Sequence, residues 1–467
     1  MPLAESVAAI AKGLMSRLRA LPRGSAAIAV SSGLWLIGGL VLLFVVDHFI
    51  VGDARLRFEA LQGLLEHGNL PSRDGHGWLP PAQYSLMGPL VSSPLYLLGY
   101  WIKSPRWWCE RYNTILLLGF GLVLVWSLRG RIKAEAVAAV VLLLTFCSMF
   151  PNHVMGFYGE VFTTTMICSG LAVVVLKDRA WGWLLVVMGC VNTMSLAIGL
   201  ALAAAFHAIK RRRLHPLLVP VAAAICILID ARIRQGRWFE FGYNSLGFAH
   251  SVLPYAREWN FELPLLVGLV SLLLSFGKGL IFFTPAFFVP LPRDTAPEVV
   301  HFHRLLQILL VGMLLVYGRF SAWSGDWYWG PRYFLLASVP SSLALGLWLK
   351  QPRAALWTRW LTLLGVALST WVAISGVVFM LEGLGACQAD EYRYIPLCWY
   401  VPDFSPLWRP ILTRNWAQLA RYWQFAVFAV AIFGWVSFFT WRSALSDTLQ
   451  VCRSALGKLF TLPEWRF

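Results

Sequence analysis

Charged side chains are scarce in this sequence: they make up 13% of its 467 residues, about half the share usual in soluble domains. No polar stretch between the apolar runs is long enough to form a separate soluble domain, and the sequence has no internal repeat or low-complexity tract. Histidine and cysteine show none of the close spacings typical of a metal site. These absences argue against a soluble fold, a repeat architecture and a dedicated His/Cys metal centre.

Apolar residues, by contrast, make up 58% of the chain and gather in uninterrupted runs. Several runs reach about 15 to 24 residues, which is long enough for a helix to cross some 30 Å of hydrocarbon. Inside lipid every backbone N–H and C=O needs a partner, and a helix supplies one within its own segment. The sequence therefore predicts an all-α, polytopic membrane protein.

We predict about twelve membrane-spanning helices, within a range of eleven to thirteen. Two of them are short, and the alternative is one long helix over 181–209, which would reverse the orientation of everything after it. Two further apolar stretches, 84–102 and 263–276, are interpreted as surface helices or re-entrant segments. The predicted spans are 26–46, 113–128, 134–150, 161–177, 180–192, 194–209, 214–230, 279–292, 303–320, 331–349, 357–380 and 423–441.

The basic residues indicate an orientation. The net charge is +16, and short basic loops fall on one predicted side of the membrane, as cytoplasmic loops do. These loops are 129–133, 177–179, 210–213, the stretch around Arg293, and 350–359. The loops on the other side are longer and rich in Trp, Tyr, Pro and Gly. No basic domain lies outside the apolar runs. We therefore interpret the positive charge as setting the orientation of the spans and contacting anionic lipid, and we expect no nucleic-acid partner.

On this prediction the chain has three parts. Residues 1–23 form a basic amphipathic helix on the cytoplasmic face, 24–441 form the transmembrane domain, and 442–467 form a cytoplasmic tail. The first outer loop covers 47–112. The run 26–46 is too long for a signal-peptide core and no small-residue cleavage site follows it, so we interpret it as a retained span.

Two cysteines, Cys387 and Cys398, share the last outer loop. A disulfide between them fits an oxidising compartment such as a periplasm, and two free thiols fit a reducing one. Spacing alone leaves both alternatives open.

The stretch SAWSGDWYWGPRY, Ser321 to Tyr333, concentrates aromatic and charged residues at the outer end of two spans. Tryptophan and tyrosine at a membrane interface form an ordinary aromatic belt. A belt does not explain Gly325, Asp326 or Arg332. For Asp326, the structural alternative is an ion pair with Arg332. At the depth of lipid phosphates, Arg332 either snorkels to the surface or holds a phosphate oxygen with both its N–H arms.

Other outer segments supply ionisable residues at the same level. Asp53 follows the first span, Glu160 stands beside the span 161–177, and Lys278 lies between two glycines. Each has a structural alternative: Asp53 as the cap of a helix over 54–66, Glu160 as a partner for loop backbone, and Lys278 as a snorkelling anchor. Asp47 is interpreted as an interface residue. Ionisable groups at membrane depth are costly, and together they indicate a site.

Carboxylates, cations and aromatic walls at a membrane surface suit one reaction in particular. In glycosyl transfer from a lipid-linked sugar phosphate, cations stabilise the departing phosphate and one carboxylate takes the proton of the acceptor hydroxyl. Aromatic faces stack on sugar rings, and the apolar carrier requires a site at the bilayer. One base without a nucleophile implies direct displacement with inversion.

Three stretches also resemble a known family: YSLMGPL…SPLYLLG, FGKGLIFFTP and WSGDWYWGPRYFLLASVP. They look like the GT-C superfamily of polyprenyl-phosphate-dependent glycosyltransferases, over about residues 30 to 420. The resemblance implies that Asp53 is the catalytic acidic residue of the first loop, that Glu160 is a second acid, and that Lys278 and Arg332 face the carrier phosphate. We also predict substrate contacts for Asp326, Trp327, Tyr328, Arg55, Arg57 and Tyr84.

These observations predict an inverting glycosyltransferase of the bacterial inner membrane, with its site facing the periplasm. It would move one sugar from a polyprenyl-phosphate donor to a hydroxyl of a lipid, glycan or protein. No cofactor is required by the residues, and a divalent cation such as Mg²⁺ or Mn²⁺, held by carboxylates and the donor phosphate, stays an alternative. Rival interpretations are a transporter or flippase of a lipid-linked sugar, a non-catalytic scaffold, and an enzyme that transfers whole glycans.

Overall fold

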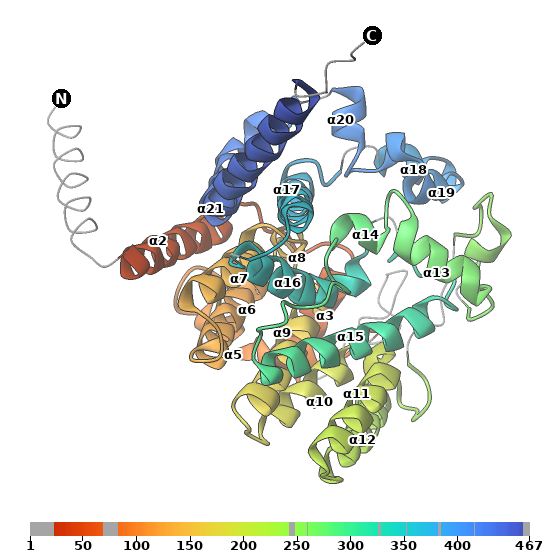
Figure 1. Ribbon diagram of the computed structural model, residues 1–467. Helices are drawn as coiled ribbons and strands as arrows, with labels where there is room; N and C mark the ends of the chain where they lie inside the picture. Colours follow the sequence, from red (N-terminus) through yellow and green to blue (C-terminus); the bar gives the residue numbers. More distant parts are fainter. Residues whose placement is uncertain are drawn as a thin grey trace, which may run out of the picture.

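The chain is built from helices. The computed structural model describes residues 23–68, 83–241, 248–258, 260–325, 328–351, 353–381, 384–414 and 416–460, and these residues form α-helices and short 3-10 helices with only two isolated β-bridges (Figure 1). The predicted surface helix over 1–23 lies outside them except for its last residue. The all-α prediction is confirmed.

Nine helical stretches in the described part of the chain are long and apolar enough to cross a membrane. Their number does not fix the number of spans, because shorter apolar helices also run through the bundle. The nine are Ser25–Phe44 in α2, Pro105–Leu128 (α6), Gly159–Leu176 (α9), Met194–Arg211 (η1 and α11), His215–Gln235 (η2 and α12), Pro297–Tyr317 (α15), Arg332–Leu349 (η4 and α16), Leu356–Val378 (α17) and Leu419–Ala455 in α21. The shorter helices are α7 (Ala134–Phe146), α10 (Gly182–Asn192) and α13 (Leu265–Leu274).

The two short neighbouring spans are separate, antiparallel helices. Helix α10 ends at Asn192, Thr193 leaves the helical conformation, and α11 (Ala197–Arg211) returns beside it. The indole of Trp183 at the start of α10 lies 5.6 Å from the imidazole of His207 near the end of α11. The alternative of one continuous helix is therefore excluded.

The predicted span over 279–292 is wrong. Only α14 (Leu280–Phe283) is helical there, and α13 precedes it across a break. The break holds because Gly277 donates its N–H to the carbonyl of Trp399 at 2.9 Å, and a Cβ at Gly277 would lie 1.8 Å from the carbonyl oxygen of Cys398. The chain after α14 contains Pro285, Pro290 and Pro292, which lack the N–H that a helix needs.

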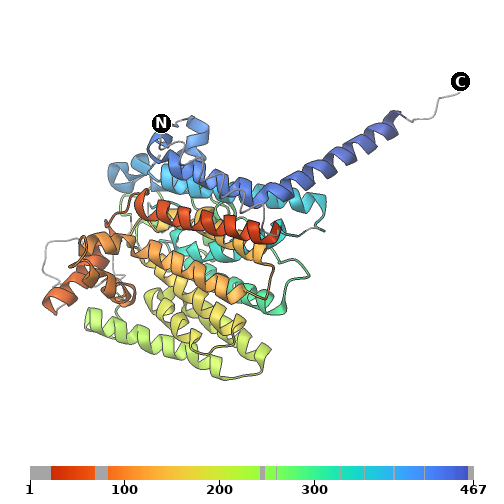
Figure 2. The ribbon, with the colours of Figure 1, turned by 90° about the vertical axis from the view of Figure 1, so that its left-hand side faces the viewer.

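Two other predicted boundaries shift. Helix α6 already begins at Pro105, inside the predicted first outer loop, because Ser104 caps it by accepting the N–H of Trp107 at 3.2 Å. Helix α21 (Leu419–Phe460) runs on through most of the predicted tail. Figure 2 shows this helix projecting from the bundle.

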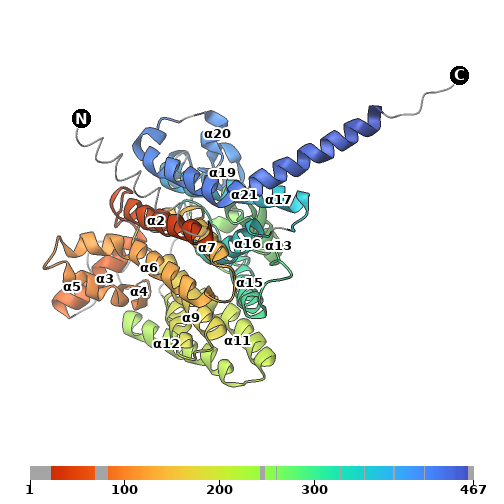
Figure 3. The ribbon, with the colours of Figure 1, turned by 60° about the vertical axis from the view of Figure 1, so that its left-hand side comes forward.

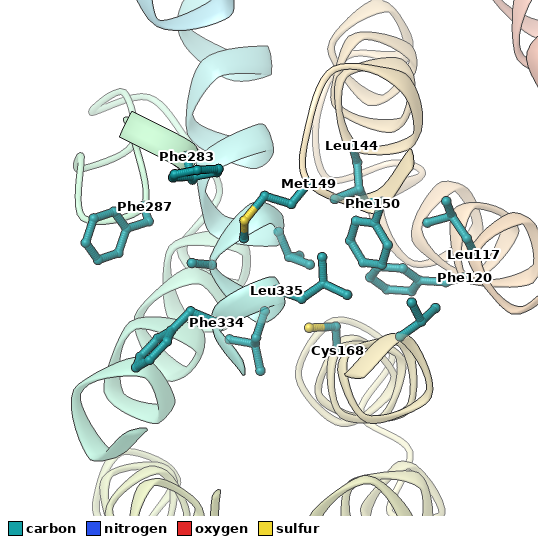
Figure 4. Packing of buried hydrophobic residues seen from close by; sticks show 14 of the residues in the cluster. Leu117, Phe120, Leu144, Met149, Phe150, Cys168, Phe283, Phe287, Phe334 and Leu335 are labelled. Carbon is teal, nitrogen blue, oxygen red and sulfur yellow. The ribbon is translucent and has the colours of Figure 1, made fainter. Parts of the chain in front are cut away.

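Helix α9 lies at the centre, and α10, α6 and α15 pack around it. Lipid is as apolar as these helices, so close packing holds them together. Glycines allow that approach: a Cβ on Gly170 of α9 would lie 2.5 Å from the carbonyl oxygen of Gly182 in α10, and Gly199 of α11 meets Gly312 of α15 in the same way. Between the helices, Phe120, Phe150 and Leu335 interdigitate with neighbouring apolar side chains (Figure 4).

The predicted basic loops gather at one end of this bundle. Arg131, after α6, pairs with Glu298 at the start of α15 at 3.1 Å and donates to the carbonyl of Leu176 at the end of α9. Arg213, after α11, lies 4.0 Å from Asp178. The helices of the first loop, α3 (Asp53–His67), α4 (Met87–Val91) and α5 (Ser93–Leu98), lie at the opposite end, and so do Glu160 and Arg332. Which end faces the periplasm stays a prediction.

Candidate active site

Two loops distant in sequence are joined edge to edge at this end. Phe49, just after α2, donates its N–H to the carbonyl of Met155 at 2.8 Å and forms a parallel bridge with Gly156. The bridge brings the start of α3 beside the start of α9. Asp53 is the first residue of α3, and Glu160 lies in the first turn of α9, so both carboxylates face the same space.

Asp53 does not cap its own helix. Gly52 occupies the N-cap with a φ of 54°, a conformation that favours glycine, and Asp53 follows it. The carboxylate of Asp53 instead forms an ion pair with Nη2 of Arg332 at 2.9 Å. The side chain of Asp53 is 24% exposed and that of Arg332 is 9% exposed.

Arg332 sits between both carboxylates. Its Nε lies 3.7 Å from Oε1 of Glu160, too far for a hydrogen bond, and among the described residues this N–H has no hydrogen-bond partner. The guanidinium also lies 5.2 Å from the centre of the Tyr333 ring. Gly325, with a φ of +70°, makes room for the stem of Arg332, since a Cβ there would lie 2.7 Å from its Cγ. One glycine of the aromatic loop is thus explained by the arginine that follows it.

A second cation, Arg57 of α3, completes the charged group. Its Nη1 donates to the carbonyl of Ser85 at 3.4 Å and lies 3.5 Å from Oδ1 of Asn192, and its guanidinium lies 4.7 Å from the centre of the Tyr84 ring. Gly159 leaves space for it, because a Cβ there would lie 2.7 Å from Nη2 of Arg57. Among the described residues, the site therefore holds two buried cations, Arg57 and Arg332, and two carboxylates, Asp53 and Glu160.

Asn192 is a site residue that the sequence did not single out. Its Oδ1 accepts from the N–H of Gly88 at 3.3 Å, and its Nδ2 donates to the carbonyl of Gly159 at 2.9 Å and to the hydroxyl of Thr163 at 2.8 Å. The side chain ties α4, α9 and α10 together next to Arg57. A polar pair, Asn192–Thr193, between two apolar runs was the available signal.

The surroundings of Asp53 act on its pKa in opposite directions. Burial is the largest influence and raises the pKa, while the charge of Arg332, a hydrogen bond from Tyr84 and the charge of Arg57 lower it. The net result is a pKa below the ordinary value of 3.8. Asp53 is therefore ionised at neutral pH and available as a proton acceptor once its partners move.

These side chains line a partly open cavity of about 110 Å³. One end is charged, and the rest is formed by hydroxyl, aromatic and aliphatic side chains. This volume is below the range of about 300 to 1,000 Å³ for pockets that hold larger ligands, so it accommodates a small polar group. Its lining includes Asp53, Arg57, Tyr84, Tyr158, Glu160, Thr163, Thr164, Asn192, Tyr317, Phe320, Arg332 and Tyr333.

The remaining predicted residues are placed differently. Lys278 is 3% exposed and donates from Nζ to the carbonyls of Tyr328 and, at 3.0 Å, Gly330, so it holds the aromatic loop from behind. Arg55 is exposed and pairs with Glu59 at 2.6 Å. Neither they nor Tyr328 line the cavity, and their substrate contacts stay predictions. Asp326 and Trp327 lie outside the described residues.

The tryptophans of this loop form no interfacial belt in the described part of the stretch. Trp323 and Trp329 are each 1% exposed. The ring of Trp323 packs against that of Trp399 at 5.4 Å, and Trp329 packs against Phe283 at 5.1 Å. Asp47 lies elsewhere, bonded to Arg421 at 2.5 Å and Tyr422 at 2.7 Å.

Comparison with known proteins found structural similarity but no similarity in sequence families. No family model matches the sequence, and no curated protein matches it. Two solved structures are similar: ArnT from Cupriavidus metallidurans bound to undecaprenyl phosphate, with a TM-score of 0.47, and the same protein in the apo state, with a TM-score of 0.49. Both are 15% identical to this chain; the matches cover 94% and 89% of it, and 80% and 78% of the ArnT chains. The likeness spans most of the chain but is distant, so the functional argument rests on the site itself.

Proposed function

We propose that the protein is an inverting glycosyltransferase that moves one sugar from a polyprenyl-phosphate donor to a hydroxyl acceptor at the membrane surface. The observation that carries the proposal is the largely buried Asp53–Arg332–Glu160 group at one end of a helical membrane bundle. A base, a fixed cation and a second acid at the charged end of one cavity match what this reaction needs.

Arg332 has one role before the donor binds and another after it binds. Before the donor binds, it neutralises Asp53 and lies near Glu160. A phosphate attracts the same guanidinium, and its Nε, which has no hydrogen-bond partner among the described residues, supplies a donor for it. When Arg332 turns toward the phosphate, Asp53 loses its strongest attraction and becomes a better base. Arg57, beside the same cavity, adds a second positive charge for the departing phosphate.

The chemical step then needs no covalent intermediate. The acceptor oxygen attacks the anomeric carbon, the bond from that carbon to the phosphate oxygen breaks, and the carrier leaves as a phosphate anion. Asp53 takes the acceptor proton, and Glu160 orients the acceptor hydroxyl. Attack from the face opposite the leaving group inverts the anomeric configuration.

A divalent cation held by Asp53, Glu160 and the donor phosphate is the alternative form of this proposal. The geometry favours the form without it, because Arg332 already stands between the two carboxylates. Among the described residues, no three His, Cys, Asp or Glu side chains converge on one point. Transfer that survives exhaustive EDTA treatment would agree with the guanidinium form, and activity restored only by Mg²⁺ or Mn²⁺ would favour the metal form.

The acceptor is a hydroxyl of a lipid, a glycan or a protein, and we place the reaction at the periplasmic face of a bacterial inner membrane. One of the two similar solved structures holds undecaprenyl phosphate, which makes its sugar esters the first donors to test. The second candidate function is a transporter or flippase of a lipid-linked sugar, because a site that binds the donor serves either role.

Chemical fate of the donor separates the two functions. Purified protein in liposomes receives a panel of undecaprenyl-phosphate sugars with a radiolabelled sugar, and thin-layer chromatography follows the label. The proposal expects the label to leave the carrier, by transfer or by slow hydrolysis. Label that crosses the bilayer while still attached to the carrier would establish the transporter instead.

A further inference from the structure

Helix α12 (Leu218–Gln235) lies at the edge of the bundle (Figure 3). Only 22% of the residues in its most apolar stretch are buried. Its last turns nevertheless contain a buried ion pair. Nε of Arg234 lies 2.7 Å from Oδ2 of Asp230, and their side chains are 5% and 10% exposed. An arginine near the end of a lipid-facing helix ordinarily turns toward water, as the exposed Arg232 does on the same helix. Arg234 turns inward.

The pair holds one short segment of the first loop, Gln83 to Leu86. Oδ1 of Asp230 accepts from the hydroxyl of Ser85 and from the N–H of Leu86, both at 3.2 Å. Nη1 of Arg234 donates to the carbonyl of Gln83 at 2.6 Å. The segment is thus fixed on both sides of Tyr84, by bonds that bridge about 150 residues of sequence, as the separations of 145 and 151 show.

The same segment carries contacts of the active site. Tyr84 hydrogen-bonds the carboxylate of Asp53 and lies over the guanidinium of Arg57. Arg57 in turn donates to the carbonyl of Ser85. A shift of this segment would therefore move a partner of Asp53 and a partner of Arg57 together.

We propose that Asp230 and Arg234 are positioning residues of the active site, which fix Tyr84 and the Ser85 carbonyl so that Asp53 and Arg57 keep their orientation. This inference rests on the proposed function, and it adds to that function a helix that contributes no side chain to the cavity lining. Burying two charges at a lipid-facing edge costs free energy unless hydrogen bonds offset the loss of water. Here the pair's hydrogen bonds go to the segment that carries Tyr84.

Kinetics of Arg234→Gln, Arg234→Lys and Asp230→Asn test the inference, with Arg232→Gln as the matched control. Misplacement of catalytic groups by about 1 Å costs up to a hundredfold, so we expect Arg234→Gln to lower kcat/KM by about 10- to 100-fold and Arg234→Lys to retain part of it. The control should keep the wild-type value. Equal losses in Arg232→Gln and Arg234→Gln would overturn the inference.

The pH profile adds a result that a merely structural role would not give. The Tyr84 hydrogen bond lowers the pKa of Asp53, so its loss raises that pKa and moves the acidic limb of the profile to higher pH. Tyr84→Phe and Arg234→Gln should each cause this shift, and the double variant should shift no further than Tyr84→Phe alone. Independent, additive shifts would show that Arg234 does not act through Tyr84.

Hydrogen exchange tests the inference without any catalysis. Leu86 donates its N–H to Asp230, so the amides of the Gln83–Leu86 segment should exchange faster in Asp230→Asn and Arg234→Gln than in the wild type, and at wild-type rates in Arg232→Gln. Unchanged exchange in the first two variants would refute the positioning role. If the exchange changes while no donor turns over in the wild type, the proposed reaction has failed and the positioning contact has not.

Discussion

Replacing Arg332 with glutamine should destabilise the protein in a pH-dependent way. The change leaves the carboxylates of Asp53 and Glu160 without the cation that stands between them. Breaking a buried ion pair costs about 3 to 5 kcal/mol, and partial exposure of both carboxylates, 24% and 15%, puts the expected loss near the lower end, at about 3 kcal/mol. With an unfolding entropy of about 2.1 cal/mol/K per residue over 467 residues, that loss corresponds to about 3 °C in Tm.

The sign of the pH dependence follows from Asp53. In the wild type its pKa is below 3.8, so the stability it contributes is present above that pH and is lost on acidification. Without Arg332, the largest of the influences that oppose burial is gone, and only Tyr84 and Arg57 still lower the pKa of Asp53, so that pKa rises. Protonation then relieves a buried charge, so the deficit of Arg332→Gln should be largest near pH 7.5 and should shrink toward about pH 5.

Thermal unfolding, followed by tryptophan fluorescence at one fixed scan rate, measures both effects. The exposed Arg55, which pairs with Glu59 on α3, supplies the matched control, and Arg55→Gln should change Tm by less than about 1 °C. The double variant Asp53→Asn/Arg332→Gln should be more stable than Arg332→Gln alone, because it removes one stranded charge. A Tm of Arg332→Gln equal to that of the wild type at pH 7.5, or a deficit independent of pH, would refute the reasoning.

Two further predictions concern the neighbourhood of the site. Lys278→Met should lower kcat by about tenfold or more with little change in donor KM, because Lys278 holds the Tyr328–Gly330 turn that leads into Arg332; a rise in donor KM at unchanged kcat would instead indicate direct phosphate contact. The Cys387–Cys398 disulfide closes a short loop, with a sequence separation of 11, so Cys387→Ser should cost about 2 to 3 kcal/mol. Reductant should lower the Tm of the wild type to that of the variant and leave the variant unchanged, and a wild type insensitive to reductant would contradict the predicted contribution.

Run length and charge were enough to predict most of the bundle. Helices such as α9 and α17 are mostly apolar and carry one charged residue each, Glu160 and Arg359, close to their starts, so their positions follow from the lengths of their apolar runs. The positions of Lys and Arg predicted that the basic loops lie at the same end of the bundle. The gathering of Asp53, Glu160 and Arg332 was predictable for the same reason: each follows or opens a span at the same end, and the membrane restricts where such ends lie.

The errors and omissions arise from contacts between distant segments. The run 279–292 is apolar enough to span, but it is broken by prolines and by the approach of Gly277 to the carbonyl of Trp399. Asn192 and the Asp230–Arg234 pair were not assigned to the site because each acts through backbone groups that lie far away in sequence. A backbone carbonyl has no signature in the sequence, so a side chain that holds one cannot be found from composition or spacing.

The most direct test of the account is single-turnover transfer by the wild type and by Asp53→Asn. Asparagine keeps the shape of the side chain and removes the proton acceptor, so with a labelled undecaprenyl-phosphate sugar and its acceptor the account predicts a rate about 10²- to 10⁴-fold lower in the variant. Donor binding should persist or strengthen, since Arg332 no longer pairs with a carboxylate at position 53. A variant that transfers sugar within tenfold of the wild-type rate would contradict the assignment of Asp53 as the base, and with it the central claim.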